Sequence, residues 1–220
     1  MNRRRISRNF GRSGSMVLRL AITLAAILLS CSPVLAASER PRAGQGVLFL
    51  RPAFPEQSDE IQSIVLYETP GVERITVLDV ARLPSLAPSV SAPSGGHAIA
   101  VTGTRGNWFR VAYDDAGREG WVEGRRFWSY FSWPDFLVGR SIVLLPGLRA
   151  ALTHLRLAPS DDSLSLGQIP SEQRLRVLEI SDEWVRISSE GSLSGWFRWR
   201  DRDGKLLLAV EMRSDPRELP

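Results

Sequence analysis

Cysteine is almost absent from this chain. Cys31 is the single cysteine in 220 residues, and it lies within the first 36 positions. The remainder therefore has no disulfide framework, no thiolate nucleophile and no zinc site of the cysteine type. Its stability must come from a packed core, and a domain of about 70 residues is near the lower size limit for one. Docking of two such domains would enlarge that core.

Histidine is also scarce, and no residue pattern typical of catalysis occurs. The two histidines, His97 and His154, each lack a second His, Cys or carboxylate at metal-ligand spacing. The chain contains no Gly-x-Ser-x-Gly, no His-Glu-x-x-His and no phosphate-binding glycine loop. The segment 201–204, Asp-Arg-Asp-Gly, resembles the start of a calcium loop, but Lys205 stands where a third oxygen ligand is needed, which favours a hairpin turn. We expect no catalytic residues, no metal and no cofactor.

The excess of positive charge disappears once the N-terminal segment is set apart. The chain has 28 basic and 24 acidic residues, and six of the basic residues but none of the acidic ones lie in positions 1–36. Removing those six leaves 22 basic against 24 acidic residues, a net charge of −2. The basic pI is therefore no indication of a nucleic-acid ligand, and we expect none.

Residues 1–36 have the pattern of an export signal. A basic region precedes Val17–Leu29, an apolar run that is too short for a good transmembrane span, and Val34-Leu35-Ala36 provides a cleavage site. An N-terminal membrane anchor that stays attached is the alternative. We expect export to the periplasm or cell envelope.

Three details leave the processing of this segment open. Arg3-Arg4-Arg5 resembles a twin-arginine motif, so general secretion and twin-arginine export are both compatible with the segment. Translation could begin at Met1 or at Met16. Leu28-Leu29-Ser30-Cys31 resembles a lipoprotein processing box, so acylation of Cys31 is an alternative to its removal with the leader. Membrane contact is expected only through the leader or such a lipid anchor.

One motif occurs twice in the rest of the chain. Residues 106–111 read Gly-Asn-Trp-Phe-Arg-Val and are followed by Gly120-Trp121-Val122, and residues 182–187 read Asp-Glu-Trp-Val-Arg-Ile and are followed by Gly195-Trp196-Phe197. The first tryptophans of the two copies are 76 positions apart and the second are 75 apart. Ser-Ile-Val-Leu recurs at 63–66 and 141–144, and Pro-Gly at 70–71 and 146–147. Four matches in one order indicate a small domain that has been duplicated.

Both copies are predicted to consist of β-strands. Ile75–Val80 is rich in β-branched residues and Leu175–Ile180 alternates apolar with polar residues. Turns are expected at 103–107, at 181–183 and at Asp203-Gly204. The predicted organisation is a signal peptide at 1–36, a lead-in segment at 37–62 whose apolar run 47–50 forms a strand or clasp, a first repeat at 63–136, a second repeat at 141–211 and a tail at 212–220.

The repeated Trp-x-Arg and Gly-Trp pairs resemble the C-terminal half of bacterial SH3-like (SH3b) domains. The segments 82–85, Arg-Leu-Pro-Ser, and 156–160, Arg-Leu-Ala-Pro-Ser, are similar to the Arg-x-x-Pro-like segment of that family. The resemblance implies an all-β chain with two tandem small, partly open β-barrels of about five strands each. It also implies a non-catalytic module that binds peptidoglycan or an envelope protein. A structural or regulatory periplasmic adaptor, whose only ligand is a partner protein, is the alternative. No oligomeric state is inferred.

Tryptophans are assigned two different roles. Four of them are predicted to hold the barrels together: Trp108, Trp121, Trp184 and Trp196. Six aromatic residues gather within 127–136, between the repeats. They either join the two barrels or line an exposed groove for a glycan or peptide. The candidate binding residues are Trp128, Tyr130, Phe131, Trp133 and, in the second repeat, Trp199.

Two loops complete the predicted surface. The loop 84–96 is rich in proline, serine and glycine, and with the aromatic junction it is the predicted recognition surface. Its shorter counterpart at 159–165 carries Asp161-Asp162. We expect these two carboxylates to be solvated turn residues.

Overall fold

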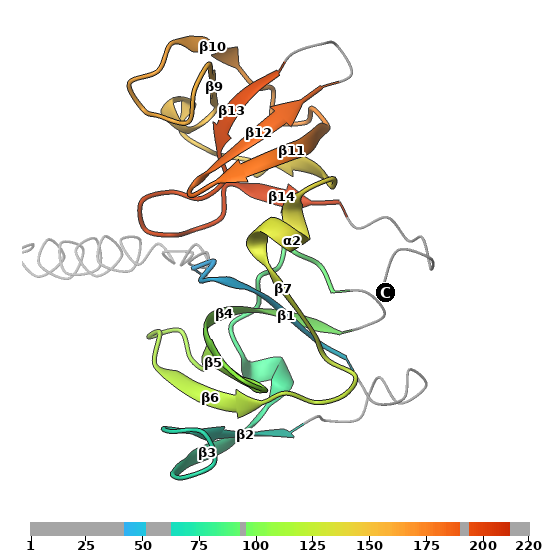
Figure 1. Cartoon of the computed structure of the whole chain (residues 1–220), viewed down its shortest axis with the longest axis vertical. Coiled ribbons are helices and arrows are strands. Elements are labelled where there is room, and N and C mark those ends of the chain that lie inside the picture. Colours follow the sequence, from blue (N-terminus) through green and yellow to red (C-terminus); the bar gives the residue numbers. More distant parts are fainter. Residues whose placement is uncertain (1–41, 52–62, 93–95, 190–193, 212–220) are drawn as a thin grey trace, which may run out of the picture. The chain divides into compact units, whose positions relative to one another are not determined.

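The structure, a computed structural model, describes residues 42–51, 63–92, 96–189 and 194–211. All of them belong to one compact unit, Arg40–Pro220. The predicted leader, its Cys31 and the tail at 212–220 lie outside the described residues. The architecture is all-β, as predicted, with two antiparallel seven-stranded sheets (Figure 1). Within the described ranges, no helix combines the length and the hydropathy needed to cross a bilayer.

The first sheet has the strand order β3-β2-β6-β5-β4-β1-β7. A short 3-10 helix, η2 (Val80–Arg82), follows its third strand. The strands are β1 (Gly46–Leu50), β2 (Ser63–Tyr67), β3 (Arg74–Asp79), β4 (His97–Arg105), β5 (Trp108–Ala112), β6 (Glu119–Glu123) and β7 (Ser129–Ser132).

The second sheet has the order β10-β9-β13-β12-β11-β8-β14. Helix α2 (Trp133–Leu137) connects the two sheets along the chain, and the 3-10 helix η4 (Ala150–Leu152) precedes β9. The strands are β8 (Ser141–Leu144), β9 (His154–Arg156), β10 (Ser165–Gln168), β11 (Leu175–Ser181), β12 (Trp184–Ser188), β13 (Ser194–Arg198) and β14 (Leu208–Val210).

The two strand orders are the same, because each strand of the first sheet is matched by the strand seven places later in the chain. The duplicated tryptophan motifs fall on matching strands, β5 with β12 and β6 with β13. The other two predicted matches are wrong. Ser63–Leu66 lies on β2, whereas Ser141–Leu144 forms β8, which corresponds to β1. Pro70-Gly71 follows β2 and Pro146-Gly147 follows β8, so they are not equivalent either.

The predicted boundary of the first repeat also needs correction. The segment 37–62 was expected to precede the first repeat, but its residues Gly46–Leu50 form β1, which is paired with β4 and β7 inside the sheet. The apolar run at 47–50 is thus a strand, as predicted. All five residues of β1 are buried. Leu48 and Leu50 pack into the core of the first half, while Val47 and Phe49 pack into the core shared with the second half. A strand buried on both faces has no polar alternation, which explains the continuous apolar sequence.

The sheets are larger and more open than the resemblance implied. About five strands were expected in each partly open barrel, whereas each sheet has seven. Among the described residues, no pairing joins the edge strand β3 to β7, or β10 to β14. The architecture shown is therefore two open antiparallel sheets, and a closed barrel is not formed by these strands.

One hydrophobic core extends across both halves. It contains Val47, Phe49 and Val90 from the first half together with the interior of the second sheet. Backbone hydrogen bonds reinforce the contact, since Ala43 N–H donates to the Gly204 carbonyl at 2.7 Å and Val210 N–H to the Ser89 carbonyl at 2.8 Å. The two sheets therefore form one packed body.

Helix α2 lies at this junction (Figure 1). The Ser132 hydroxyl accepts a hydrogen bond from Asp135 N–H at 3.4 Å and caps the helix, and Pro134 lies in its first turn. Trp133, Phe136 and Leu137 are buried. The sequence did not predict this helix, because five residues are too few to display a helical period.

The predicted turns are formed. Gly106 and Gly204 adopt positive φ angles of 57° and 77°, and Asp182 adopts 49°. Glycine, and less often Asp, accepts this left-handed conformation at little steric cost. These residues lie at the predicted turns, where they reverse the chain.

Candidate functional site

The second half contains an open pocket of about 680 Å³. It lies between the segment that follows β8, the end of β9, the β9–β10 hairpin and the turn that follows β13. Five basic and three acidic side chains line it, beside an apolar wall. The lining residues are Leu145, Pro146, Gly147, Leu148, Arg149, Ala151, Leu152, Arg156, Asp161, Arg198, Asp201, Arg202, Asp203 and Lys205.

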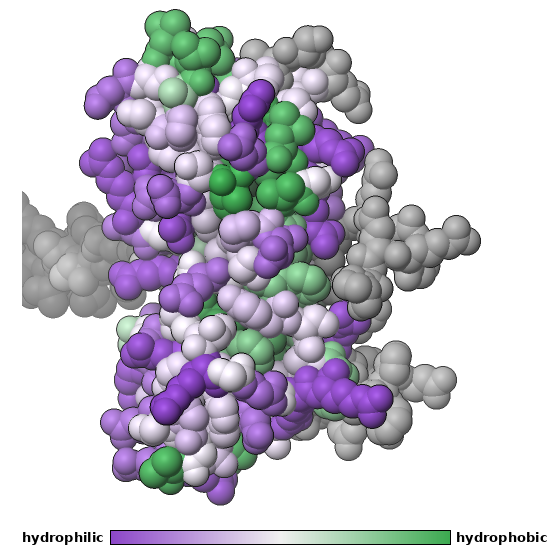
Figure 2. Space-filling model, viewed as in Figure 1, coloured by the Kyte–Doolittle hydropathy of each residue, from purple (hydrophilic) through white to green (hydrophobic). Residues whose placement is uncertain are grey.

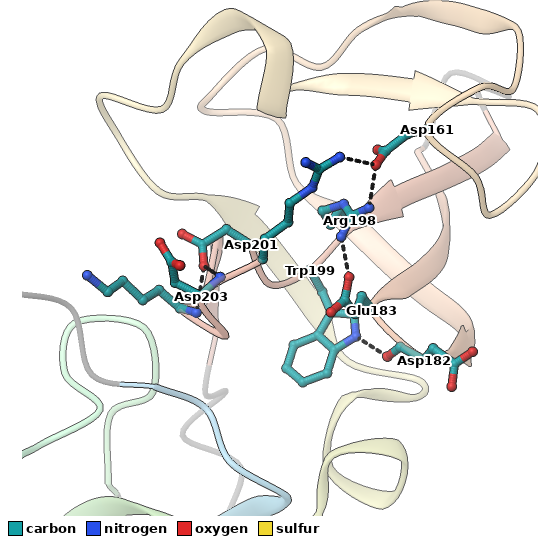
Figure 3. Close-up of polar contacts among 9 residues, drawn as sticks. Asp161, Asp182, Glu183, Arg198, Trp199, Asp201 and Asp203 are labelled. Atoms are coloured by element: carbon teal, nitrogen blue, oxygen red, sulfur yellow. Dashed lines mark hydrogen bonds and ion pairs between the residues drawn. The ribbon is translucent and has the colours of Figure 1, made fainter. Parts of the chain in front are cut away.

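A tight turn shapes one side of this pocket. The Asp201 carboxylate accepts hydrogen bonds from the backbone N–H groups of Asp203, at 3.0 Å, and Lys205, at 2.8 Å. Gly204 supplies the positive φ that the turn requires. The sequence predicted this hairpin turn, whose contacts to Asp201 are drawn in Figure 3. The structure adds that residues of the turn line the pocket.

Arg198, at the end of β13, is the most constrained cation of the pocket. It donates to Asp161 at 2.8 Å and to Glu183, so that its guanidinium lies between two carboxylates (Figure 3). Its guanidinium carbon also lies 4.8 Å from the ring centroid of Trp184, its cross-strand neighbour. The side chain is only 13% exposed. Arg198 is thus neutralised and fixed by its neighbours.

Asp161 is the second partner in this arrangement. It accepts from Arg198 and, at 3.3 Å, from Arg202. Partial burial acts to raise the pKa of this carboxyl, but the hydrogen bonds and charges of the two arginines prevail and hold its pKa below the ordinary value of 3.8. Asp161 is an exposed turn residue, as predicted, and the structure adds its two arginine partners. The sequence alone did not reveal these partners, because Arg198 and Arg202 lie 37 and 41 residues from Asp161 along the chain.

Two other arginines face the pocket with donors available to a ligand. Arg149 is exposed, just before η4. Arg156 donates from Nη1 to the Ser163 carbonyl at 2.8 Å, which uses one of the five N–H groups of a guanidinium. A guanidinium presents those donors in a planar fork that matches a carboxylate. The pocket can therefore bind an anion.

Matching positions in the first half carry different chemistry. Arg156 is opposite Trp196 on the neighbouring strand, and in the first sheet Tyr67 is opposite Trp121. Tyr67 therefore takes the place of Arg156. In the same way, Glu123 is opposite Trp108 where Arg198 is opposite Trp184.

Tyr67 therefore adds a third aromatic ring to the face of the first sheet that carries Trp108 and Trp121. The rings of Tyr67 and Trp108 meet edge to face with centroids 5.4 Å apart. A Cβ added to Gly103 would lie 3.8 Å from the Trp121 ring, so that ring packs close to this backbone. Arg110 and Glu119 form an ion pair at 2.7 Å on the same face.

The candidate binding aromatics do not form one exposed groove. Trp133 is 2% exposed and Trp199 is 1% exposed, and their ring centroids are 5.2 Å apart in the shared core. Trp128 is buried in the first core, and Tyr130 and Phe131 are half-buried against the two cores. A fully buried ring cannot stack on a ligand, so the structure favours the interpretation that this cluster joins the two halves.

The indole nitrogens in the shared core have acceptors. Trp133 Nε1–H donates to the Ala43 carbonyl and Trp199 Nε1–H donates to the Asp182 carbonyl, each at 2.9 Å. Buried indoles of this kind are favourable because the apolar ring is buried and its one donor is satisfied. Trp199 thus belongs to the core of the second half.

The four tryptophans assigned structural roles occupy two environments. Trp184 is buried, whereas Trp108, Trp121 and Trp196 are half-buried on the outer faces of their sheets. Trp184 and Trp108 thus differ in burial although they lie on matching strands, β12 and β5. The difference arises because Arg198 covers the Trp184 ring, while the exposed Glu123 stands opposite Trp108.

Residue clusters suited to metal binding were not expected. In the part of the chain that the structure describes, no group of three or more His, Cys, Asp or Glu side chains is placed to hold a metal ion. His97 Nε2 lies 2.9 Å from the Leu83 carbonyl, and His154 Nδ1 lies 2.9 Å from Ser165 Oγ. Each histidine thus has a local hydrogen-bond partner.

Comparison with known proteins gives limited likeness. No family model matches the chain, and no curated protein matches it. Two solved structures are similar, NlpC2 and NlpC1 from Trichomonas vaginalis, each at 12% identity over 79% of this chain. The TM-scores are 0.33 and 0.30. This chain spans about half the length of each, 50% and 52%. Likeness at this level carries no argument about fold or function.

Proposed function

We propose that the chain is an exported, non-catalytic binding protein whose two halves are tandem bacterial SH3-like domains. The repeated strand order and the placement of the Trp-x-Arg and Gly-Trp pairs on matching strands support this assignment. The N-terminal basic and apolar pattern supports export to the periplasm or cell envelope.

The proposed ligand is peptidoglycan. The observation that carries this proposal is the pocket in the second half, where arginines stand beside an apolar wall. The peptide stems of peptidoglycan offer free carboxylates next to small apolar side chains. A concave site with few charged groups and an apolar lining is typical of ligand binding.

Retention on purified sacculi tests this function. The exported protein, purified from an expressing bacterium, should sediment with sacculi at about physiological ionic strength, and retention should weaken as salt rises because exposed charges are screened. An excess of soluble stem peptides should release it. Failure to sediment under these conditions contradicts peptidoglycan binding.

An envelope protein is the second candidate ligand. Figure 2 shows a hydrophobic patch where Figure 1 places β9 and β10, and three exposed leucines come from that hairpin: Leu157, Leu164 and Leu166. Exposed apolar patches of this kind favour protein contact. Chemical crosslinking in cells that recovers one envelope protein, together with no retention on sacculi, would favour the adaptor function.

Anchoring through Cys31 is the alternative form of localisation. If the lipoprotein processing box is used, metabolic labelling with a palmitate analogue labels the wild type but not Cys31→Ser. An unlabelled wild-type protein contradicts the lipid anchor and leaves the cleaved signal.

A further inference from the structure

We propose that the pocket in the second half binds the terminal carboxylate of a short peptide, and that the matching face of the first half does not. This inference rests on the proposed function and adds to it the site, the half that carries it and the chemical group recognised. Arg149 and Arg156 are the residues assigned to the carboxylate.

The balance of charge in the pocket selects these two arginines. Arg198 is already paired with Asp161 and Glu183, and Arg202 also donates to Asp161. The carboxylates of Asp161 and Glu183 are therefore already paired with these two arginines. Arg149 and Arg156 have no carboxylate among the ion pairs found in the described residues, and both line the pocket. An incoming carboxylate would supply the missing anion.

The backbone that carries Arg156 is tightly held. A Cβ added to Gly195 would lie 2.8 Å from the Arg156 carbonyl oxygen and 2.7 Å from Leu155 Cγ, so β9 lies in close contact with β13. Leu155 is fully buried beside it. The hydrogen bond from Arg156 to the Ser163 carbonyl further restricts the guanidinium. A donor fixed in this way loses little conformational entropy on binding.

Size and lining indicate a peptide instead of a lone anion. A pocket of about 680 Å³ is within the range of sites that hold organic ligands of several groups. Leu145, Leu148 and Leu152 line it together with the arginines. This wall would pack against small apolar side chains next to the carboxylate, such as the methyl groups of alanine.

In the described residues of the first half, two of these arginines are replaced by residues that carry no positive charge. At the matching positions Tyr67 replaces Arg156 and Glu123 replaces Arg198, so a ring and an acid stand where the second half has two arginines. A carboxylate brought to that face would meet Glu123, which is exposed. Carboxylate binding is therefore assigned to the second half alone.

Calorimetric titration of the full exported protein tests the inference. The probe is diacetyl-lysyl-D-alanyl-D-alanine, which has one free carboxylate beside two methyl groups, and its C-terminal amide is the matched control ligand. We expect the acid to bind and the amide to bind at least about tenfold more weakly, because a charge-assisted hydrogen bond is lost. Arg156→Gln and Arg149→Gln should each weaken binding of the acid by about tenfold as well.

Two control variants separate the pocket from general charge. Arg186→Gln removes an arginine from the outer face of the same sheet, and Arg110→Gln removes its counterpart in the first half. Neither lines the pocket, and neither should change the affinity. Because Arg149 is exposed, its variant is expected to fold even if Arg156→Gln does not, and thermal melting of each variant checks this.

Each outcome distinguishes the inference from the function on which it rests. If the acid does not bind, or binds no better than the amide, the inference is overturned. If both pocket variants bind the acid as well as wild type does, the assignment of Arg149 and Arg156 is wrong. If sacculi still retain the protein in that case, the proposed function stands without this site. If the peptide binds through Arg149 and Arg156 but sacculi do not retain the protein, the pocket is supported and peptidoglycan binding fails.

Discussion

Arg198 donates to two carboxylates and lies over the ring of Trp184, although its sequence neighbours are a phenylalanine and a tryptophan. Its partners come from the β9–β10 hairpin and from the turn before β12. A sequence pattern cannot reveal such a contact, because it depends on which segments the sheet brings together. The Trp-x-Arg and Gly-Trp pairs, by contrast, are local and could be recognised directly.

Replacing one carboxylate of this arrangement should alter acid stability. Folding lowers the pKa of the Asp161 carboxyl below its ordinary value of 3.8. The charged carboxylate therefore stabilises the folded protein at pH values above 3.8. That stabilisation is lost as the pH falls through the lowered pKa of the folded state. We expect Asp161→Asn to lose about 1 kcal/mol or less at pH 7. The difference from wild type should shrink toward pH 3 and below.

Chemical denaturation at pH 7 and at pH 3 measures this difference. Asp162→Asn, at the adjacent exposed position, is the control and should change stability little at either pH. A loss for Asp161→Asn that stays constant down to the lowest pH would show that charge pairing is not its cause.

The tryptophans differ in how much each should contribute to stability. Trp133 is 2% exposed and packs against Trp199 and Phe136. We expect Trp133→Ala to cost about 3–5 kcal/mol through the cavity it leaves. Trp121→Ala, on the half-buried outer face, should cost clearly less. Urea denaturation of both variants gives the comparison, and equal losses would contradict the assignment of Trp133 to the shared core.

At the scale of elements, the sequence predicted β-strands correctly but matched only some of them correctly between the halves. Each tryptophan motif occupies the same two neighbouring strands in both halves, β5 and β6 in the first and β12 and β13 in the second. Ser-Ile-Val-Leu is a generic strand sequence, and its two copies lie on strands that are not equivalent, β2 and β8. The true counterpart of β8 is β1, whose sequence is wholly apolar because both of its faces are covered. Burial on a second face depends on tertiary packing and could not be inferred from spacing.

The close pairing of β1 with β7 can be tested by substitution at Gly46. A Cβ on Gly46 would lie 2.3 Å from the Phe131 carbonyl oxygen, which is backbone and cannot move aside cheaply. Gly46→Ala should therefore separate β1 from β7 and cost about 3 kcal/mol. Gly106→Ala is the control, because its added methyl group would have nothing within 4 Å and only the positive φ opposes it, so it should cost about 1–2 kcal/mol. A smaller loss for Gly46→Ala than for the control would contradict the close pairing of β1 with β7.

At the scale of the whole molecule, the two halves share a core and should unfold together. Residues of β1, helix α2 and the second sheet belong to one cluster, so neither half can lose its structure without exposing the other. We expect a single calorimetric transition whose calorimetric and van't Hoff enthalpies agree. Two resolved transitions would show that the halves are independent domains.

The pocket is also a property of the whole second half. Its lining comes from separate stretches of the chain, at 145–152, 156, 161 and 198–205. No motif connects these stretches, and the predicted recognition surfaces, the loop at 84–96 and the aromatic junction, do not include them. The sequence thus indicated a binding module, and the fold was needed to place a candidate site on it.

Chemical-shift mapping of the isotope-labelled protein, titrated with diacetyl-lysyl-D-alanyl-D-alanine, tests the central claim most directly. We predict that the largest backbone amide shifts occur at Arg149, Arg156 and Asp161 and along the turn 201–205, and that the amides of Tyr67, Trp108 and Trp121 hardly move. Shifts concentrated on the aromatic face of the first sheet, or no shifts anywhere at saturating peptide, would contradict the claim that this protein recognises a peptide carboxylate in the pocket of its second half.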